Sequence, residues 1–220
     1  MVAGLDEHLL GSALRRNRPV WRLWEPRRVR VVLGRSSPME RELHLSRCAA
    51  DRVPIQRRFG GGCSVVLAPG MVIFSLAYVV RWTDRSMAHL HQWTRLIAEA
   101  LREHGVNDLS VQGVSDVCVG DRKIMGSCLY RTRQLCLYQA SLLVSCDLDV
   151  LERYLALPVR MPAYRRGRAH REFLTTLERQ GCVWTCGDVM GMINRAMALA
   201  WTPSGQHDPA LAPDAALANA

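Results

Sequence analysis

The sequence predicts an α+β fold: a single domain with a central mixed β-sheet flanked by helices. The 220 residues, of which 49% are hydrophobic and 22% charged, suffice for one sizeable domain with its own core. An apolar run at residues 71–80 is rich in Val, Ile, Phe and Tyr, which is typical of a buried strand. Residues 87–104 place apolar side chains at helical spacing, so strands and helices are expected to share one core.

The N-terminal half alternates short strands with two helices. The first helix, residues 5–16, carries four leucines, most of them on one face. The glycines at 60–62 and the Ala-Pro-Gly at 68–70 are turn signals that separate strands. We expect strands at residues 19–24, 29–33, 53–58, 63–67 and 71–80, and a second helix at residues 40–50.

The C-terminal half contains a hairpin and most of the helices. A turn near Gly120-Asp121 would join strands at residues 115–119 and 123–129. A further strand is expected at residues 135–144, an extended segment at 158–162, and helices at 87–104, 149–155, 168–180 and 188–201. Residues 202–220 are rich in Ala, Pro, Asp and Asn and predict a disordered tail after a domain spanning residues 1–201.

Arginine dominates the charge. The formal net charge is +9 at pH 7, and arginines cluster in short segments such as 27–30 and 165–168. Such charge suits an anionic partner, which would be a nucleotide, a nucleic acid or an acidic protein, whereas a solvated basic surface is the alternative. The clusters match no nucleic-acid-binding module, so nucleic acid is not the partner we expect.

The chain is expected to be cytoplasmic. No signal-type apolar segment opens the sequence, and the run at 71–80 is about half of a membrane span. Eight cysteines occur without a C-x-x-C pair, which favours free thiols over a zinc site. His89 and His91 lie two apart on a helix, so they do not share a face and form no metal site.

The strongest local signal is the segment RRFGGGCS at residues 57–64. Glycines let a backbone approach a ligand closely, and successive N–H groups bind anions. The two arginines would clamp a phosphate, whereas a tight turn beside a chance arginine pair is the alternative. The spacing is that of neither a dinucleotide fingerprint nor a P-loop.

A second segment, DVCVGDRKIMGS at residues 116–127, contains the only lysine of the chain, Lys123. In a protein that otherwise uses arginine, one lysine suggests a task for a compact ammonium, such as contact with a phosphate or an activated carbonyl. Gly126 would leave room for that contact. The alternative is an exposed lysine in a hairpin.

Together these segments resemble the lipoate–protein ligases. Residues 57–75 resemble the RRxxGGGAV motif and following strand of that family, and residues 116–127 resemble its ND…GxKIxGS stretch. Residues 140–155, which carry ASLLV, DL and LxxYL, resemble its GTLL…DL…LxxYL stretch. The order and separations agree, and the resemblance covers roughly residues 5–180.

The resemblance implies a class II synthetase-like fold, shared with biotin ligase catalytic domains. It implies that ATP and Mg²⁺ serve to convert lipoate or octanoate to an acyl-adenylate, and that the acyl group passes to a lysine of an acidic lipoyl carrier domain. That carrier would be of the 2-oxoacid dehydrogenase E2 or glycine-cleavage H protein type, and the positive net charge would steer it. The residues do not choose among lipoate, octanoate and biotin.

The resemblance also assigns site residues by position. Lys123 would be catalytic and would contact the α-phosphate and the acyl carbonyl. Asp116 would contact Mg²⁺ or the amine of the carrier lysine. The expected nucleotide- and acyl-binding residues are Arg58, Gly61, Gly62, Cys63, Ser64, Val65, Val66, Ser75, Gly126, Ser127 and Ser141.

The chain departs from the ligase pattern at several positions. Leu67 and Ala68 stand where ligases usually carry His-Asp, and Met71 stands where they carry Asn. Cys63 replaces the third motif glycine, and Ser115 replaces the Asn of Asn-Asp.

Related octanoyltransferases take octanoyl from acyl carrier protein and use a catalytic cysteine. Its positions correspond to Leu157 in one subfamily and to residues 108–110 in another, and neither stretch contains Cys. Cys128 and Cys63 lie close to the expected site and are the alternative nucleophiles, although a structural thiol is the default for each.

Four interpretations therefore stand after the sequence. Many ligases carry a separate C-terminal accessory domain, and none follows within these residues. We expect a one-domain ligase, a ligase that needs an accessory subunit, or an ATP-independent octanoyl or lipoyl transferase. A non-catalytic paralogue that binds a nucleotide, cofactor or carrier is the fourth, motivated by the apolar residues at 67, 68 and 71.

Overall fold

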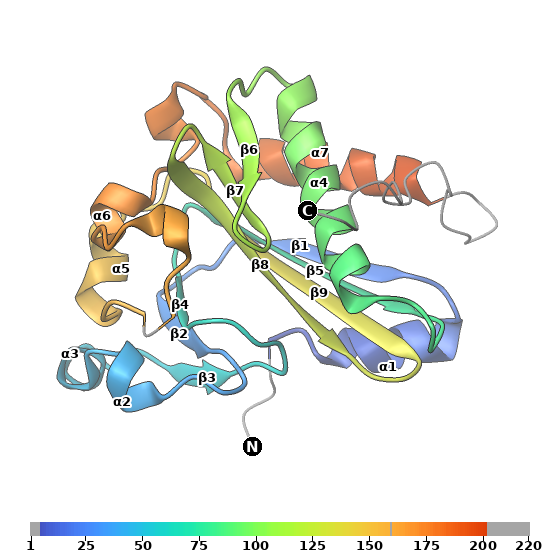
Figure 1. Cartoon of the computed structure of the whole chain (residues 1–220), viewed down its shortest axis with the longest axis horizontal. Coiled ribbons are helices and arrows are strands. Elements are labelled where there is room, and N and C mark those ends of the chain that lie inside the picture. Colours follow the sequence, from blue (N-terminus) through green and yellow to red (C-terminus); the bar gives the residue numbers. More distant parts are fainter. Residues whose placement is uncertain (1–4, 159, 202–220) are drawn as a thin grey trace.

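The computed structural model describes residues 5–158 and 160–201, and within them the predicted α+β fold is confirmed (Figure 1). A six-stranded antiparallel sheet forms the centre, and a three-stranded sheet lies beside it. The large sheet contains, in spatial order, β1 (Val20–Trp24), β5 (Met71–Val79), β9 (Leu135–Leu143), β8 (Arg122–Arg131), β7 (Asp116–Val119) and β6 (Leu109–Gln112). The small sheet contains β3 (Ile55–Arg57), β2 (Arg30–Leu33) and β4 (Val65–Leu67). Its β2–β3 pair is parallel, so the small sheet is mixed, whereas the central sheet, which the sequence predicted to be mixed, is antiparallel.

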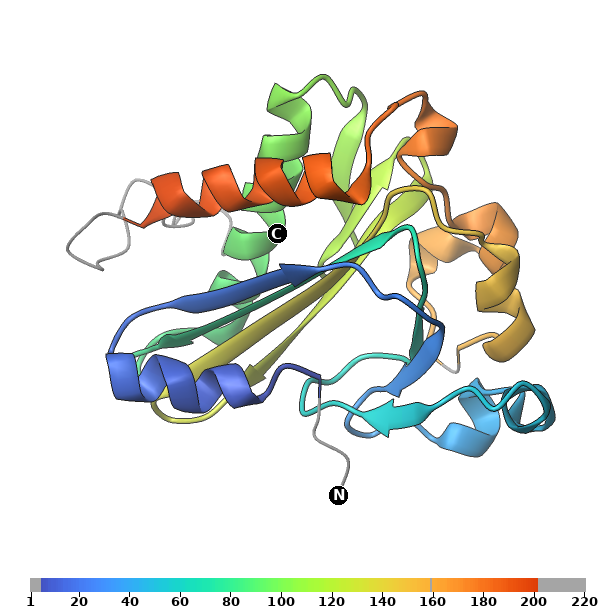
Figure 2. The same ribbon diagram turned by 180° about the vertical axis from the view of Figure 1, so that it is seen from behind.

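The helices cover both faces of the large sheet and one end of the small one (Figures 1 and 2). The longer helices are α1 (His8–Arg16), α4 (Ser86–Glu103) and α7 (Cys186–Ala200). The shorter ones are α2 (Met39–Glu42), α3 (Leu45–Ala50), α5 (Asp149–Tyr154), α6 (His170–Phe173) and the 3₁₀ turns η1 (Ala163–Arg165) and η2 (Glu178–Gln180).

Strand β5 shows how the sheet separates two cores. Successive side chains of a strand point to opposite faces. Phe74 and Leu76 pack in the cluster shared with α4 and α7. Ile73 packs with the small sheet, and Ala77 packs with α1 on the opposite face. Both faces of β5 are therefore buried, which explains the continuous apolar run in its sequence.

Three sequence predictions differ from the structure. The helix expected at 40–50 is two short helices, and the helix expected at 168–180 is α6 and η2 with an extended stretch between them. That stretch pairs with the start of β8 through a bridge between Leu174 and Lys123, so its backbone hydrogen bonds go to the sheet. Strand β6 was not predicted.

The predicted tail at 202–220, and residues 1–4 of the predicted domain, lie outside the described residues. Within the described part of the chain, no helix is long and apolar enough to cross a membrane.

The buried carboxylate of Asp6 ties the N-terminal segment to the large sheet. It accepts hydrogen bonds from Arg22 at 2.6 Å, Trp24 Nε1 at 2.9 Å and Ser75 Oγ at 2.9 Å. We expect Asp6→Ala to lower the free energy of unfolding by about 2–4 kcal/mol, because it leaves buried donors without an acceptor.

Urea denaturation followed by circular dichroism measures this change. The matched control is Ser75→Ala, which removes one donor and leaves the carboxylate in place, at a cost of about 1 kcal/mol. An equal loss of unfolding free energy in the two variants would contradict the conclusion that Asp6 links the N-terminal segment to the large sheet.

Candidate active site

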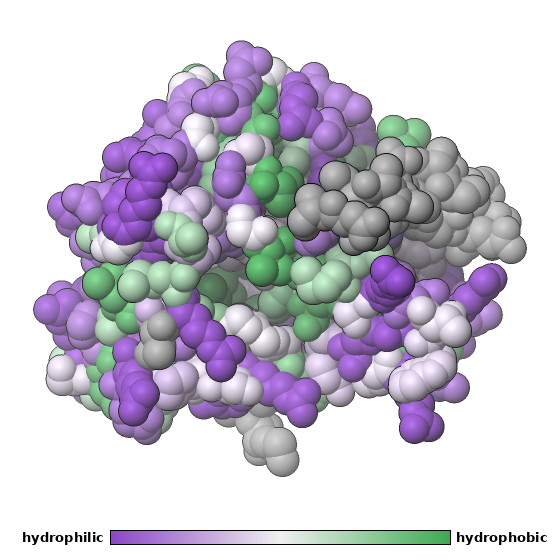
Figure 3. All heavy atoms as spheres, in the orientation of Figure 1, coloured by the Kyte–Doolittle hydropathy of each residue, from purple (hydrophilic) through white to green (hydrophobic). Residues whose placement is uncertain are grey.

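A cavity of about 790 Å³ lies at the junction of the two sheets and is the candidate site. Its floor is formed by β8 and β9, and its walls by residues 61–67 and by the chain between residues 151 and 174. Figure 3 shows the molecule hollowed near the centre of this face, with apolar residues gathered around the hollow. The larger apolar side chains that line the cavity include Val66, Leu67, Ile73, Leu143, Leu151, Leu155, Phe173 and Leu174.

The glycine loop, residues 58–64, connects β3 to β4 along one wall of the cavity. Arg58 is buried at its base, with 6% of its surface exposed. Its Nη2 donates hydrogen bonds to the carbonyl oxygens of Gly61 at 2.7 Å and Cys63 at 2.9 Å. The arginine expected to clamp a phosphate therefore clamps the loop itself and fixes its path beside the cavity.

Two further side chains fix the glycine loop and the turn beside it, and neither role was predicted. The buried carboxylate of Glu42 accepts hydrogen bonds from the backbone N–H of Ser64 at 2.7 Å and from its hydroxyl at 2.6 Å. Arg57 donates to the carbonyl oxygens of Gly34 at 2.6 Å and Ser37 at 3.0 Å, on the neighbouring turn. These bonds fix the path of the loop without any ligand, which suits close contact with its backbone N–H groups.

A β-bulge in β8 decides which way Lys123 points. Val117 of β7 pairs with Met125, and the next residue, Cys118, pairs with Lys123, so Ile124 is an extra residue on β8. Ile124 and Met125 both pack in the cluster shared with α4 and α7, although neighbours on a regular strand would face opposite sides. The bulge therefore reverses the alternation and turns Lys123 toward the cavity.

The carboxylate of Asp116 holds Lys123 in this position, and the absence of a side chain at Gly126 leaves room for it. Its Nζ lies 2.7 Å from Asp116 Oδ1, and Tyr164 donates a hydrogen bond of 2.7 Å to Asp116 Oδ2. A Cβ atom on Gly126 would lie 2.7 Å from the same Nζ, so only glycine leaves the ammonium in this position. Burial, reinforced by the negative charge of Asp116, raises the pKa of Tyr164, which keeps the phenol protonated and donating.

The wall formed by the chain between residues 151 and 174 carries two polar residues that the site assignment omitted. Burial lowers the pKa of His170, and its Nε2 lies 3.2 Å from the carbonyl oxygen of Ala156, so a neutral imidazole donates that bond. Arg165 is 4% exposed, and its guanidinium lies 4.7 Å from the centre of the Phe173 ring. The only signal of this wall in the sequence is the arginine cluster at 165–168.

The two alternative nucleophiles are not prepared as thiolates. Burial raises the pKa of Cys63, and Glu42 raises it further, while the nearby charges of Lys123, Arg58 and Arg160 only oppose the rise. Burial likewise raises the pKa of Cys128. Catalytic cysteines need a lowered pKa. Among the described residues all eight cysteines are free thiols.

The structure brings nearly all of the expected site residues to the cavity. Those that line it are Arg58, Gly61, Gly62, Cys63, Ser64, Val65, Val66, Asp116, Lys123, Gly126, Ser127, Cys128 and Ser141. Ser75 is the exception, because it is fully buried under α1 and donates its hydrogen bond to Asp6. Its assignment failed because it lies on β5 beyond the part of the strand that borders the cavity.

The donor set of the cavity does not form a metal site by itself. In the described part of the chain, no group of three or more His, Cys, Asp or Glu side chains could hold a metal ion. The carboxylates among the lining residues are Asp116 and Glu42, and each already accepts hydrogen bonds from the protein. Such a set fits Mg²⁺ only where the ion takes most of its ligands from phosphates and water.

Comparisons with known proteins agree with this architecture. A family model described as the lipoyl protein ligase A/B catalytic domain matches residues 2–198. Lipoate-protein ligase A subunit 1 from Thermoplasma acidophilum is 28% identical over 169 residues, which cover 72% of this chain and 63% of that protein. Lipoate–protein ligase 1 from Plasmodium falciparum is 27% identical over 139 residues, which cover 63% of this chain and 32% of that protein. The chain therefore spans about a third to under two thirds of the length of these relatives.

Three solved structures share the fold. Lipoate-protein ligase A bound with ATP has a TM-score of 0.70 at 21% identity, over 87% of this chain and 77% of that one. A bipartite ligase from Thermoplasma acidophilum, described with its E2 lipoyl domain, has a TM-score of 0.70 at 22% identity, over 82% and 70%. A ligase structure from the same organism with bound lipoic acid has a TM-score of 0.68 at 22% identity, over 82% and 72%.

The geometry around Gly126 predicts the reactivity of the single lysine. In Gly126→Ala the new methyl group displaces the Lys123 ammonium from Asp116. We expect reductive methylation of the Lys123 amine to become about fivefold faster. This factor corresponds to the loss of an ion pair worth about 1 kcal/mol.

Mass spectrometry of the modified Lys123 peptide measures the rate. Gly61→Ala is the matched control, because its Cβ would meet nothing within 4 Å. An unchanged rate in Gly126→Ala would show that the lysine is not held over this glycine.

Proposed function

Because the chain belongs to the family of lipoyl protein ligase A/B catalytic domains, as its match over residues 2–198 shows, we propose that it is a lipoate– or octanoate–protein ligase. In this proposal it forms an acyl-adenylate from ATP and the free acid, and it transfers the acyl group to a lysine of a lipoyl carrier domain. The observation that carries the proposal is the fixed position of Lys123, opposite the glycine loop on the floor of one cavity.

Lys123 supplies the charge that adenylate formation needs. Attack of a carboxylate on the α-phosphate builds negative charge on the phosphoryl oxygens, and attack of an amine on the adenylate builds it on the acyl carbonyl oxygen. A preorganised ammonium stabilises both without reorganising during the reaction. The Lys123 ammonium is preorganised in this sense, because Asp116 pairs with it and Gly126 has no side chain that would displace it.

The cavity offers separate surroundings for the acyl chain and for the nucleotide. The apolar side chains of Val66, Ile73 and Leu143 suit a medium-length acyl chain. The backbone N–H groups of the glycine loop suit phosphate oxygens. ATP and lipoic acid are bound in the two relatives described with them, which supports both assignments.

Magnesium fits this site as a companion of ATP. Asp116 is the carboxylate beside Lys123 that would hold the ion together with the phosphates. When bound, Mg²⁺ would neutralise part of the charge of the triphosphate. After pyrophosphate has left, with AMP still joined to the acyl group, the same carboxylate would attract the amine of the incoming carrier lysine, and the attack of that amine would release AMP.

The partner in this proposal is an acidic lipoyl domain. A net charge of +9 favours encounter with an acidic partner. The bipartite relative described with its E2 lipoyl domain supports this class of partner. Because that ligase is described as bipartite, and the sequence relative from the same organism is named subunit 1, we also propose that a second subunit assists the reaction.

The ATP-independent transferase is the weaker alternative. An acyl-enzyme requires a thiolate, and burial raises the pKa of both Cys63 and Cys128. The non-catalytic paralogue was motivated by Leu67, Ala68 and Met71. These residues are at most 3% exposed and pack in the core beside the small sheet, so packing accounts for their apolar character.

Intact-mass analysis of an apo lipoyl domain tests the proposal. One reaction contains the protein, ATP, Mg²⁺ and lipoate or octanoate, and a second contains octanoyl–acyl carrier protein without ATP. We expect acylation in the first reaction alone, and we expect Lys123→Ala to slow it by roughly 10²–10³-fold.

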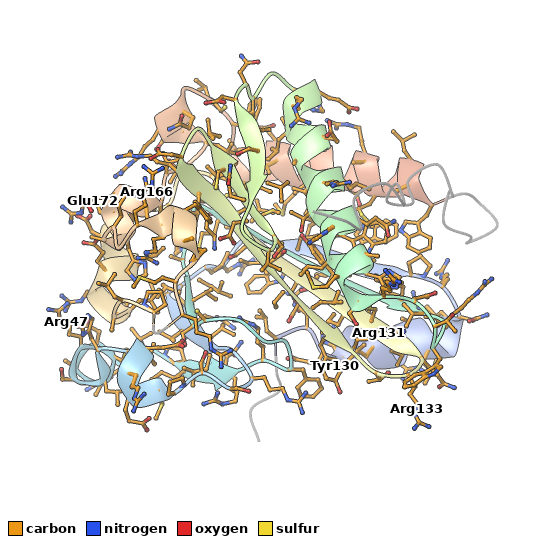
Figure 4. All side chains as sticks on the ribbon, in the orientation of Figure 1. Arg47, Tyr130, Arg131, Arg133, Arg166 and Glu172 are labelled. Carbon is orange, nitrogen blue, oxygen red and sulfur yellow. The ribbon has the colours of Figure 1, made fainter. Side chains whose placement is uncertain are left out.

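Arg133→Gln is the matched control, because Arg133 is exposed and lies at the turn between β8 and β9, at the far end of the large sheet (Figure 4). Acylation in the second reaction alone would make the protein a transferase. Activity of Lys123→Ala equal to that of the wild type would remove the central residue of the proposal.

A further inference from the structure

Arg165 enters the cavity wall from a tight turn. The turn η1 ends at Arg165, and the next two residues, Arg166 and Gly167, have φ values of +53° and +71°. Arg168 holds the turn in place, because its side chain donates to the carbonyl oxygen of Arg165 at 3.1 Å and to the carboxylate of Asp121 at 2.7 Å. Arg165 consequently points inward, whereas Arg166 is exposed (Figure 4).

The Arg165 guanidinium is poorly satisfied for a buried charge. Its Nε donates to the carbonyl oxygen of Arg168 at 2.9 Å. Its Nη2 is buried, and no acceptor in the described part of the chain reaches it. The ion pairs formed by the described residues do not include Arg165. Contact with the Phe173 ring, at 4.7 Å, offsets only part of the desolvation.

Arg58, the other buried cation of the site, also has a buried donor, its Nε, without an acceptor among the described residues, but its Nη2 is satisfied. Two carbonyl oxygens accept both close bonds of Arg58 Nη2. Lys123, which is partly exposed, is paired with Asp116. Burial of an uncompensated charge is costly, and it lowers the pKa of Arg165. An anion that entered the cavity would supply the missing acceptors.

The charge of the cavity indicates which anion this is. Five cationic side chains line it, against the carboxylates Glu42 and Asp116, which leaves an excess of three positive charges. A single carboxylate would neutralise only one of them. The cationic side chains are Arg58, Lys123, Arg131, Arg160 and Arg165.

We infer that Arg165 is an anion-binding residue whose ligand is a phosphoryl group of a di- or triphosphate. The planar guanidinium presents paired N–H donors that match phosphate oxygens. This inference rests on the proposed function, because it assigns the nucleotide phosphates to this wall. In that setting Arg165 binds phosphate beside Lys123 and does not bind the acyl chain.

Calorimetric titration of the whole protein with inorganic pyrophosphate, ATP and octanoate tests the inference without any reaction. We expect Arg165→Gln to weaken pyrophosphate and ATP binding by about tenfold or more, the scale of a charge-assisted bidentate contact. Binding of octanoate is expected to stay unchanged. Arg166→Gln is the matched control, because it removes the same charge from the adjacent, exposed position.

Arg165→Lys separates charge from shape and guards against misfolding of the first variant. This variant keeps the positive charge but loses the paired N–H donors of the guanidinium, so we expect an intermediate affinity for pyrophosphate. We also expect its thermal unfolding temperature without ligand to be close to that of the wild type. Equal pyrophosphate affinity of the wild type and Arg165→Gln would overturn the inference, and so would a loss of octanoate binding alone. If pyrophosphate binding depends on Arg165 but no carrier is ever acylated, the anion site stands and the ligase proposal fails.

Discussion

The β-bulge at Ile124 is the feature on which the rest of the site depends. If Ile124 were paired as in a regular strand, Lys123 would face the same side as Met125 and point into the core shared with α4 and α7, where an unpaired ammonium would be very costly. With the bulge, the lysine reaches the cavity beside Asp116 and lies over Gly126. One inserted residue thus links the register of the β7–β8 hairpin to the position of a charged group, and bulges commonly re-aim a side chain in this way next to active sites.

Both sheets and the chain that follows them contribute to the cavity. The small sheet supplies the glycine loop, which Arg58 and Glu42 hold from within. The large sheet supplies the floor, and the chain between residues 151 and 174 closes the remaining side. Because Arg58 Nη2 and the Glu42 carboxylate bond the loop from within the protein, the loop is preorganised, and the binding energy of a ligand is not spent on ordering it.

Much of this could be predicted from the sequence, and the failures have physical causes. Periodicity identified β5 and α4 because each has a long, strongly patterned apolar face. The order of three short motifs identified the family, and all of the residues assigned from those motifs except Ser75 line the cavity, because the motifs are local. The predictions that failed depend on contacts between distant parts of the chain. The role of Glu42 was missed because its bond to Ser64 joins two separate segments. Ser75 was assigned to the site from its strand alone, without knowledge that Asp6 lies beside it. The helix expected at 168–180 was overridden by pairing of its middle with β8, which no local propensity encodes.

Carboxylate-dependent exchange of labelled pyrophosphate into ATP tests the central claim most directly, because it isolates adenylate formation and needs no carrier domain. The account predicts exchange that requires lipoate or octanoate, that requires Mg²⁺, and that falls to background in Lys123→Ala. Absence of exchange in the folded wild-type protein, together with transfer from octanoyl–acyl carrier protein, would contradict the account.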